Sequence, residues 1–312
     1  MRLAKRALAF LLVILTLSFS LLSLSSCSPE TKEAVSFTDS IGNSVSLGSK
    51  PSRVAVLFSS LAQMWSLAGG EVAVSVAESV ERGFCSHETP LVHSDAGGAG
   101  KTVNTELLIA EQPDFVICTA DYSGQLELAN LLEALGIPVA YFRIDSFSDY
   151  LSVFKIMTDI TGNSEAYDRY GSEISNCIEK LLQNIPQTEK RVLFVRATRS
   201  SAKAKLSCDH FAANMLSELG AENIADKAPI LLDGISAEVL LRENPDMIFI
   251  STMGDEAAAV QYINELFQRP EWAALDAVKN KNYVILSKEL FQYKPCVRWC
   301  EAYEVLYGYL YE

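Results

Sequence analysis

The feature that most constrains the fold of this chain is a stretch of sequence that occurs twice. Residues 104–120 read NTELLIAEQPDFVICTA, and residues 236–252, 132 positions later, read SAEVLLRENPDMIFIST. The two copies share five residues at equal spacing: Glu106 with Glu238, Leu108 with Leu240, Glu111 with Glu243, Pro113 with Pro245 and Asp114 with Asp246. Each copy predicts a short amphipathic helix, a break and a buried strand. Two such units indicate two lobes of related build.

Apolar runs alternate with stretches of helical period in both parts of the chain. Strands are predicted at residues 53–58, 115–118, 139–142, 191–195, 247–250 and 283–286. Helices over 126–135 and 211–219 are each followed by a glycine, which commonly ends a helix. Ser59 and Ser60 follow the first strand, where we expect them to cap a helix. This alternation predicts an α/β fold with parallel sheets covered on both faces.

The middle of the chain is helical throughout. No strand pattern interrupts residues 147–184, and the second half of this segment runs for about 20 residues, or about 30 Å of helix. A helix of that length predicts a rigid strut between the lobes. The expected organisation is a signal segment at 1–26, a tether at 27–35, an N-terminal lobe at 36–146, a helical segment with the linking helix at 147–186, and a C-terminal lobe at 187–312.

The first 26 residues predict targeting and not fold. Arg2, Lys5 and Arg6 precede an apolar stretch over 7–24, and Ser25 and Ser26 stand directly before Cys27. This pattern resembles the lipobox of bacterial lipoproteins, which implies cleavage before Cys27 and a lipid on its thiol. An uncleaved transmembrane anchor is the alternative. We expect the body to lie at the outer face of the cytoplasmic membrane, extracellular or periplasmic, where ATP and NAD are lacking.

The charge of the chain weighs against a nucleic-acid partner. The formal net charge is −13, and the first 26 residues contribute three positive charges and no acid, so the remainder stands at −16. A body this acidic is repelled by phosphate backbones.

Six cysteines follow Cys27, and their spacing is too wide for a small disulfide-stapled domain. Cys118 lies in an apolar run, which indicates a core thiol. Cys296 and Cys300 are four apart on a predicted helix, so a metal site is an alternative for them, although no matching pair occurs elsewhere. The sequence leaves open whether any of the six pair.

Enzymatic motifs come close and fail. Gly100-Lys101-Thr102 resembles the end of a phosphate-binding loop, but Asp95 stands where that loop needs a glycine. His93 stands six positions after His87 and Pro90 lies between them, which excludes a metalloprotease helix. No Gly-x-Ser-x-Gly elbow occurs, and a total of three histidines argues against a multi-histidine metal site. We expect no catalytic residue, no metal site and no intrinsic cofactor.

Cationic residues gather between positions 191 and 210, where five arginines and lysines face one aspartate. The segment follows a predicted strand, and ligands of open α/β sheets bind beyond the carboxyl ends of strands. Arg196 and Arg199 are therefore candidates to clamp an anionic ligand, because guanidinium groups pair with carboxylates in a bidentate way. The alternative is a solvated basic loop.

Aromatic and cationic side chains also gather near the end of the chain. Residues 291–295 lead into a helix expected to start at about Val297, and Tyr293, Arg298 and Trp299 are candidates to face a large planar or chelated ligand. Trp299 and Tyr303 are four apart and fit the core face of a terminal helix equally well. Ser59 and Tyr122 complete the candidate ligand set.

The order of these pieces resembles the class III periplasmic-type substrate-binding proteins of ABC importers for ferric siderophores, haem and cobalamin. Apart from the lipobox, the resemblance covers about residues 36–312. The pieces that carry it are the lipobox, FTDSIGN at 37–43, PSRV at 51–54, FSSL at 58–61, the two repeats, LGIPV at 135–139, and PEW at 270–272 followed by Lys279 and Tyr283-Val284. The resemblance implies two Rossmann-like lobes joined by one long helix, with a ligand in the cleft between them. It also implies that Glu106 and Glu238 dock on arginines of a two-fold permease.

The function expected from this resemblance is capture of an iron complex or similar chelate and its delivery to an ABC permease with its ATPase. Haem and cobalamin are alternative ligands, although histidine and methionine are scarce among the cleft candidates. The basic segment favours a chelate that carries carboxylates. Two other classes remain open: an extracellular enzyme on the same scaffold, and a sensor or adhesion lipoprotein without a permease.

Overall fold

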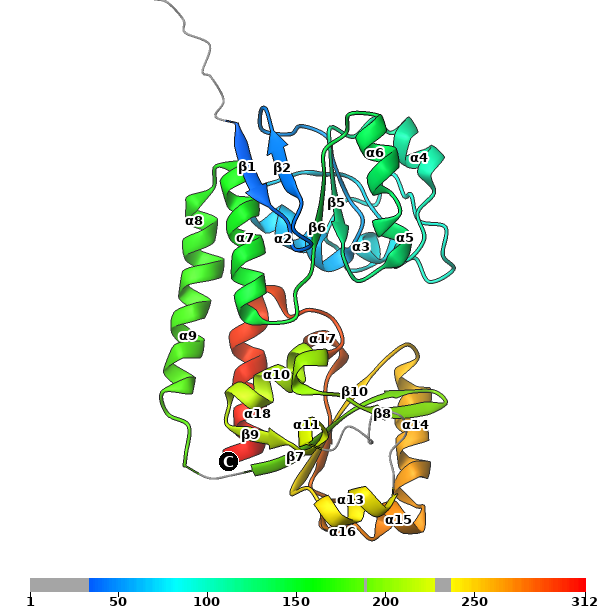
Figure 1. Cartoon of the computed structure of the whole chain (residues 1–312), viewed down its shortest axis with the longest axis vertical. Coiled ribbons are helices and arrows are strands. Elements are labelled where there is room, and N and C mark those ends of the chain that lie inside the picture. Colours follow the sequence, from blue (N-terminus) through cyan, green and yellow to red (C-terminus); the bar gives the residue numbers. More distant parts are fainter. Residues whose placement is uncertain (1–33, 188–189, 228–236) are drawn as a thin grey trace, which may run out of the picture.

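The computed structural model describes residues 34–187, 190–227 and 237–312, which fold into two α/β lobes stacked along the long axis of the molecule (Figure 1). The predicted fold class is confirmed. The signal segment and Cys27 lie outside the described residues. Within the described ranges, no helix is both long and apolar enough to cross a membrane.

The N-terminal lobe is built on a four-stranded, all-parallel sheet with the order β4-β3-β5-β6. A hairpin of β1 (Val35–Thr38) and β2 (Ser44–Leu47) precedes it. The strands of the sheet are β3 (Val54–Val56), β4 (Val72–Val74), β5 (Phe115–Thr119) and β6 (Val139–Phe142). Its helices are α2 (Ser59–Leu67), α3 (Ala77–Glu81), α4 (Thr105–Ala110), α5 (Ser123–Leu126) and α6 (Ala129–Ala134).

The C-terminal lobe has a five-stranded sheet in which β11, β10 and β7 are parallel neighbours and both β9 and β8 pair with β7. Only β8 is antiparallel. The strands are β7 (Lys190–Thr198), β8 (Ser201–Ala204), β9 (Ala221–Asn223), β10 (Met247–Thr252) and β11 (Tyr283–Ile285). Its helices of eight residues or more are α10 (Phe211–Glu218), α14 (Glu256–Phe267) and α18 (Trp299–Tyr311). Shorter helical pieces are η2 (Ser207–Asp209), α11 (Ile224–Lys227), α13 (Ala237–Glu243), α15 (Pro270–Ala273), α16 (Asp276–Lys279), α17 (Lys288–Phe291) and η3 (Cys296–Arg298).

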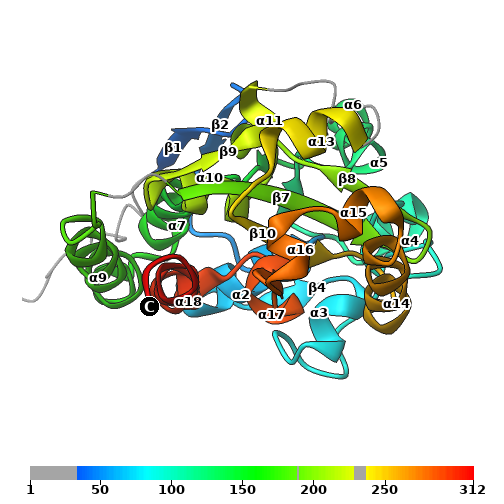
Figure 2. The ribbon, with the colours of Figure 1, turned by 90° about the horizontal axis from the view of Figure 1, so that it is seen from below.

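The linking segment is helical, as predicted. Helix α7 (Phe147–Thr161) ends at Gly162, whose φ of 75° ends the helix in the left-handed conformation that glycine tolerates best. The strut follows as one continuous run of α8 (Ser164–Tyr167), a π-helical segment η1 (Asp168–Ser172) and α9 (Glu173–Leu182). Figures 1 and 2 show it along one side of both lobes, with α9 beside α18.

The sequence repeat corresponds to a repeated structural unit. Before β5, the side chain of Arg53 bonds to the carbonyl and the carboxylate of Glu111, and Asp114 accepts the backbone N–H of Arg53 at 2.9 Å. Before β10, Arg191 bonds in the same two ways to Glu243, and Asp246 accepts the backbone N–H of Arg191 at 2.8 Å. The shared Glu and Asp therefore tie each repeat helix to the first parallel strand of its lobe.

Trp299 belongs to the core that the two lobes share, and its assignment as a ligand contact is wrong. Its side chain is fully buried, with ring centroids 5.8 Å from Phe147, 5.8 Å from Phe211 and 6.2 Å from Tyr150. These aromatic residues belong to one hydrophobic cluster that also includes strand residues of both sheets, such as Val56 and Phe194. The core is therefore continuous across the lobe boundary.

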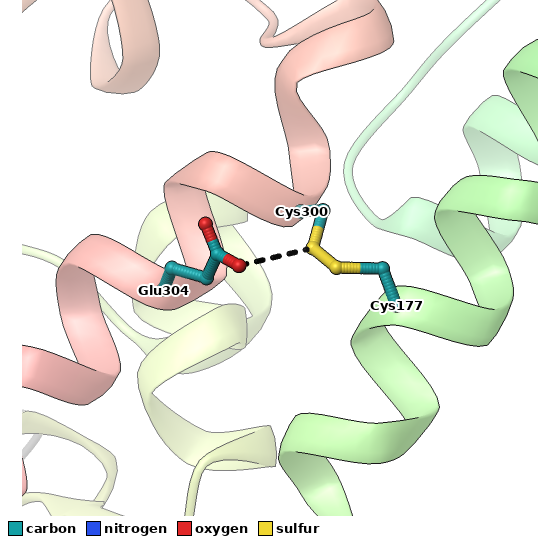
Figure 3. A group of neighbouring side chains, drawn as sticks. All are labelled: Cys177, Cys300 and Glu304. Carbon is teal, nitrogen blue, oxygen red and sulfur yellow. Dashed lines mark hydrogen bonds between the residues drawn. A yellow bond between two sulfur atoms is a disulfide. The ribbon is translucent and has the colours of Figure 1, made fainter.

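A disulfide between Cys177 and Cys300 joins α9 to α18 (Figure 3). The Cα atoms are 6.0 Å apart, and the carboxylate of Glu304 lies 3.8 Å from the Cys300 sulfur. The alternative that Cys296 and Cys300 share a metal is wrong, because Cys300 is bonded to Cys177 and the Cys296 side chain is buried. Cys118 is a fully buried core thiol, as predicted.

Candidate functional site

A cleft of about 730 Å³ lies between the lobes, on ends of strands from both sheets. Its volume is in the range of small-molecule sites, about 300–1,000 Å³. The N-terminal lobe lines it with Phe58, Ser59, Ser60, Glu78, Asp95, Gly97, Ala99, Lys101 and Tyr122. The C-terminal lobe lines it with Arg196, Thr198, Arg199, Met253, Gly254, Asp255, Gln292, Tyr293 and Lys294.

Parallel strands explain why these residues meet. Phe58 and Ser59 follow β3, Tyr122 follows β5, Arg196 and Thr198 stand at the end of β7, and residues 253–255 follow β10. The carboxyl ends of parallel strands share one edge of a sheet, where open α/β folds bind ligands. Because both sheets present this edge to the lobe boundary, residues far apart in the chain converge on one cleft.

Five of the seven candidate ligand residues line this cleft: Ser59, Tyr122, Arg196, Arg199 and Tyr293. The other two do not. Trp299 is in the shared core, and Arg298 forms an ion pair with Glu301, one turn along α18, at 2.6 Å on the surface. The expectation that Ser59 and Ser60 cap α2 is wrong as well, since Phe58 occupies the N-cap position and no side-chain capping bond is made.

The basic segment at 191–210 divides in the structure. Arg196 and Arg199 line the cleft, whereas Arg191 stands near the opposite end of β7 and pairs with Glu243 at 2.7 Å. The positive charges of this segment therefore have two roles. Arg196 and Arg199 face the cleft, and Arg191 pairs with the helix of the second repeat.

The three carboxylates of the cleft are already engaged by protein donors. Glu78 accepts a hydrogen bond from the Ser59 hydroxyl at 2.6 Å. Asp95 accepts the backbone N–H groups of Ala99 at 3.0 Å and Thr102 at 3.4 Å. Asp255 caps α14 by accepting from the backbone of Ala258 at 3.1 Å. Because these carboxylates already accept hydrogen bonds from the protein, they do not need a cationic group of the ligand as a partner.

Cations of the cleft are less satisfied. Among the described residues, no acidic side chain forms an ion pair with Lys101, Arg196 or Arg199. Arg196 is half-buried, and burial lowers the pKa of its guanidinium, while the nearby Tyr122 acts to raise it. A partly desolvated cation without a partner is costly, so the cleft favours an anionic group at this point.

Tyr122 adds an aromatic side chain to the lining of the cleft. Its ring packs edge-on against Phe58 with centroids 5.6 Å apart. Burial, with added repulsion from Glu78, Asp121 and Asp95, raises the pKa of Tyr122 to about 12. The phenol therefore stays protonated at neutral pH and can donate a hydrogen bond to a ligand oxygen.

Several cleft residues escaped the sequence reasoning. Lys101 belongs to a phosphate-loop motif that fails, and neither Glu78, in the short helix α3, nor Asp95, in a loop, belongs to a recognisable sequence pattern. Met253 and Asp255 could have been found, because they follow the second repeat just as Tyr122 follows the first. Gln292 and Lys294 flank the predicted Tyr293.

The three histidines lie outside the set of cleft-lining residues. His210 is buried beside Phe194 and caps α10 by accepting the backbone N–H of Ala212. A second hollow of about 980 Å³ lies near the amino ends of β10 and β11. Since parallel sheets bind ligands at the carboxyl ends of their strands, we assign the functional site to the interlobe cleft.

Glu106 and Glu238 are both exposed, in the first turns of α4 and α13. Figures 1 and 2 place these two helices on different lobes, on the side of the molecule away from α9. The repeat thus puts one exposed carboxylate at a matching position on each lobe.

Comparison with known proteins agrees with this architecture. Residues 54–290 match the family model described as periplasmic binding protein. The chain therefore belongs to the periplasmic binding protein family, and the resemblance seen in the sequence is confirmed.

Individual relatives are distant in sequence. A vitamin B12-binding protein of Pectobacterium carotovorum is 24% identical over 187 residues, which is 58% of this chain and 64% of that protein. The match thus spans less than two thirds of that relative. Staphylococcus aureus SirA complexed with staphyloferrin B superposes with a TM-score of 0.66 at 17% identity, covering 88% of this chain and 98% of SirA. Staphylococcus aureus IsdE complexed with haem gives 0.66 at 16% identity, covering 84% and 100%. These likenesses establish the two-lobed fold.

Proposed function

We propose that this protein is the membrane-anchored substrate-binding protein of an ABC importer and that its ligand is an anionic iron chelate. The observation that carries this proposal is the half-buried Arg196, which lines the interlobe cleft without an acidic partner among the described residues. Arg199 and Lys101 add positive charge at the same cleft of an otherwise acidic protein. Carboxylate groups of a ferric siderophore would satisfy these cations.

The same cleft supports binding and not catalysis. Its carboxylates are held by backbone and serine donors, and its tyrosine phenol stays protonated. Such groups recognise a ligand by shape and charge. Turnover of a bound chelate by the purified protein would favour an extracellular enzyme instead.

Haem and cobalamin are the alternative ligands, since relatives of this fold include proteins described as binding them. Met253, which directly follows β10 and is 41% exposed, is a cleft residue that could approach a ligand metal. The three histidines, in contrast, are not among the residues that line the cleft.

Native purification followed by mass spectrometry and a visible spectrum tests the ligand class. Haem, cobalamin and ferric catecholates absorb at different wavelengths, and a ferric carboxylate complex lacks the strong bands of the first two. We then expect purified protein to bind ferric citrate more tightly than haemin or cyanocobalamin. Tighter binding of haemin or cyanocobalamin would reject the anionic-chelate proposal.

The double variant Arg196→Ala/Arg199→Ala tests the clamp. We expect ferric citrate affinity to fall by about 3 kcal/mol, roughly a hundredfold, because two charge-assisted hydrogen bonds are lost. Its salt dependence should also weaken, while thermal stability stays nearly unchanged. Arg242→Ala/Lys281→Ala is the matched control, since it removes the same charge from exposed positions near the amino ends of β10 and β11. Equal affinities in both variants would reject the clamp and support the alternative that Arg196 and Arg199 belong to a solvated basic loop.

The docking and anchoring roles complete the proposal. Glu106 and Glu238 would meet cationic residues of a two-fold permease, where complementary charges set register and association rate. The alternative is a purely structural role, in which each glutamate stabilises the first turn of its helix by about 0.3–1 kcal/mol. That account explains each residue singly but not their matched placement in the repeat. Lipidation of Cys27 would hold the protein at the membrane beside the permease.

A transport assay in the native host tests docking. We expect Glu106→Ala/Glu238→Ala to retain ligand affinity and stability but to lose uptake. Glu165→Ala/Glu173→Ala, on the exposed face of the linking helix, is the charge-matched control and should transport normally. Normal uptake by the first variant would reject the docking role and leave a sensor or adhesion lipoprotein as an alternative. Lost ligand binding would mean that these glutamates belong to another surface.

A further inference from the structure

Arg82 joins the two walls of the cleft without being one of its lining residues. It follows α3 in the N-terminal lobe, and its guanidinium carbon lies over two aromatic rings. The guanidinium carbon is 3.9 Å from the centroid of Tyr293, in the C-terminal lobe, and 4.6 Å from that of Phe84. A cation at these distances is attracted to the ring faces. Arg82 therefore fixes an aromatic cleft residue of the opposite lobe.

The same guanidinium organises the N-terminal wall. Arg82 donates to the Ser59 hydroxyl at 3.0 Å, and that hydroxyl donates to Glu78 at 2.6 Å. Ser59 is only 1% exposed, so the middle of this chain of bonds is shielded from solvent, while Arg82 and Glu78 are half-buried. Ser59 and Glu78 both line the cleft. One side chain thus sets the position of three lining residues: Ser59, Glu78 and Tyr293.

Lys294, which follows Tyr293 in the chain, is also held across the lobe boundary. Lys294 donates to the carbonyl of Ile144, at the end of the N-terminal sheet, and lies 3.4 Å from the carboxylate of Asp145. Its side chain is only 16% exposed. Figures 1 and 2 show α17, which precedes this loop, at the junction of the lobes near α2 and α3. Tyr293 and Lys294 are therefore pinned by consecutive contacts to the opposite lobe.

Burial makes the arrangement sensitive to the shape of the side chain. Desolvation lowers the pKa of Arg82, against the opposing effects of Glu78 and Tyr293, but the group remains a cation at any physiological pH. A planar guanidinium can stack between two rings and donate in its own plane, whereas an ammonium group cannot do both. Lysine at this position would keep the charge and lose the geometry.

We propose that Arg82 is a positioning residue for ligand binding, which clamps Tyr293 of the C-terminal lobe to Ser59 and Glu78 of the N-terminal lobe and so presets the cleft before the ligand arrives. The clamp rests on the proposed function only in its effect on ligand affinity. In the ligand-free protein, Arg82 holds the loop at 292–294 in place whether or not the proposed function is right. Preset walls strengthen binding because the ligand no longer has to order them.

Hydrogen exchange on the ligand-free protein tests the clamp independently of any ligand. We expect Arg82→Lys to accelerate amide exchange in the loop at 292–294 by several-fold, with the exchange of β10 unchanged. Arg169→Lys is the matched control, because Arg169 lies 5.3 Å from the ring of Tyr170 within the linking helix and crosses no lobe boundary. Unchanged exchange at 292–294 in Arg82→Lys would overturn the proposal.

Titration with ferric citrate tests the effect on binding. We expect Arg82→Lys to weaken affinity about two- to thirtyfold, the range for a partly desolvated cation–aromatic contact. In a Tyr293→Leu background the same change should weaken affinity clearly less, because Arg82 then positions only Ser59 and Glu78. Tyr293→Phe, which keeps the ring, should preserve the response to Arg82→Lys. A similar loss of affinity in both the wild-type and Tyr293→Leu backgrounds would show that Arg82 does not act through Tyr293.

These two experiments separate the possible failures. If no chelate binds the wild-type protein, the proposed function fails, while the exchange experiment still decides the clamp. If the chelate binds and Arg82→Lys changes neither exchange nor affinity, the proposed function stands and the clamp is rejected.

Discussion

Removal of the Cys177–Cys300 disulfide should cost this protein a large fraction of its stability. The bond joins residues separated by 123 positions, and in the chain-entropy account a closed loop of that length stabilises the folded state by about 5 kcal/mol at 25 °C. Folded domains are stable by only about 5–15 kcal/mol in total. We therefore expect Cys177→Ser/Cys300→Ser to fold but to unfold at a much lower urea concentration.

Urea denaturation of a soluble form that begins at Ser28 is the assay. The wild-type protein should lose about 3–5 kcal/mol of unfolding free energy when a thiol reductant is added, within the range typical of native disulfides. The double variant should be insensitive to the reductant. Cys208→Ser removes an exposed free thiol and should respond to the reductant as the wild type does.

A thiol count checks the premise. Cys85, Cys118, Cys208 and Cys296 are the free cysteines of the described residues, so unfolded protein without reductant should react with four equivalents of a thiol reagent. Six equivalents, together with equal stability in the presence and absence of reductant, would refute the reasoning. Ferric citrate affinity should not change in the double variant, because neither cysteine lines the cleft.

Three further predictions follow from the shared core and the cleft. Trp299→Ala should lower the unfolding free energy by about 3–5 kcal/mol, as is typical for a buried tryptophan, while Trp299→Phe costs less; unchanged stability in Trp299→Ala would contradict its place in the core. Burial, with added repulsion from Arg196, Lys294 and Lys205, holds the pKa of His210 well below its usual 6.5, so the unfolded chain binds more protons and stability falls as pH drops below about 6.5. His210→Asn should reduce that fall in denaturation curves at pH 7.5 and pH 5, and an undiminished fall would assign it to other groups. Small-angle scattering should show little closure on ligand binding, and a decrease of several ångströms in the radius of gyration would contradict a stiff linker.

The fold was largely predictable because its signals are strong and local. All six predicted strands are present, although β3 and β11 have only three residues each, and the missed strands β1, β2, β4, β8 and β9 are similarly short. Strands this short gain their identity from pairing with neighbours that the local pattern does not reveal. The strand–helix alternation and the long helix set the remaining architecture.

The cleft was only half predictable because its residues come from different loops. Arg196 and Tyr122 follow recognisable strands, so the rule for parallel sheets finds them. Trp299 and Tyr303 show the opposite case. They are four residues apart on one helix and both are buried in the core. Helical spacing alone does not distinguish a core face from a ligand-binding face. Arg82 had no sequence signal at all, because its role depends on Tyr293, which lies more than two hundred residues away in the chain.

The contacts between the lobes have a common consequence for recognition. Trp299 joins the aromatic core of α7, α10 and α18, the disulfide fixes α9 to α18, and Lys294 reaches the end of the N-terminal sheet. A boundary held by a packed core resists large hinge motion, since close-packed interiors deform little. Discrimination between ligands must then come chiefly from the side chains that line a nearly preset cleft. Under the proposed function, fixed cations such as Arg196 select the charge of the ligand, so exchange of a few cleft residues would change the ligand on an unchanged fold.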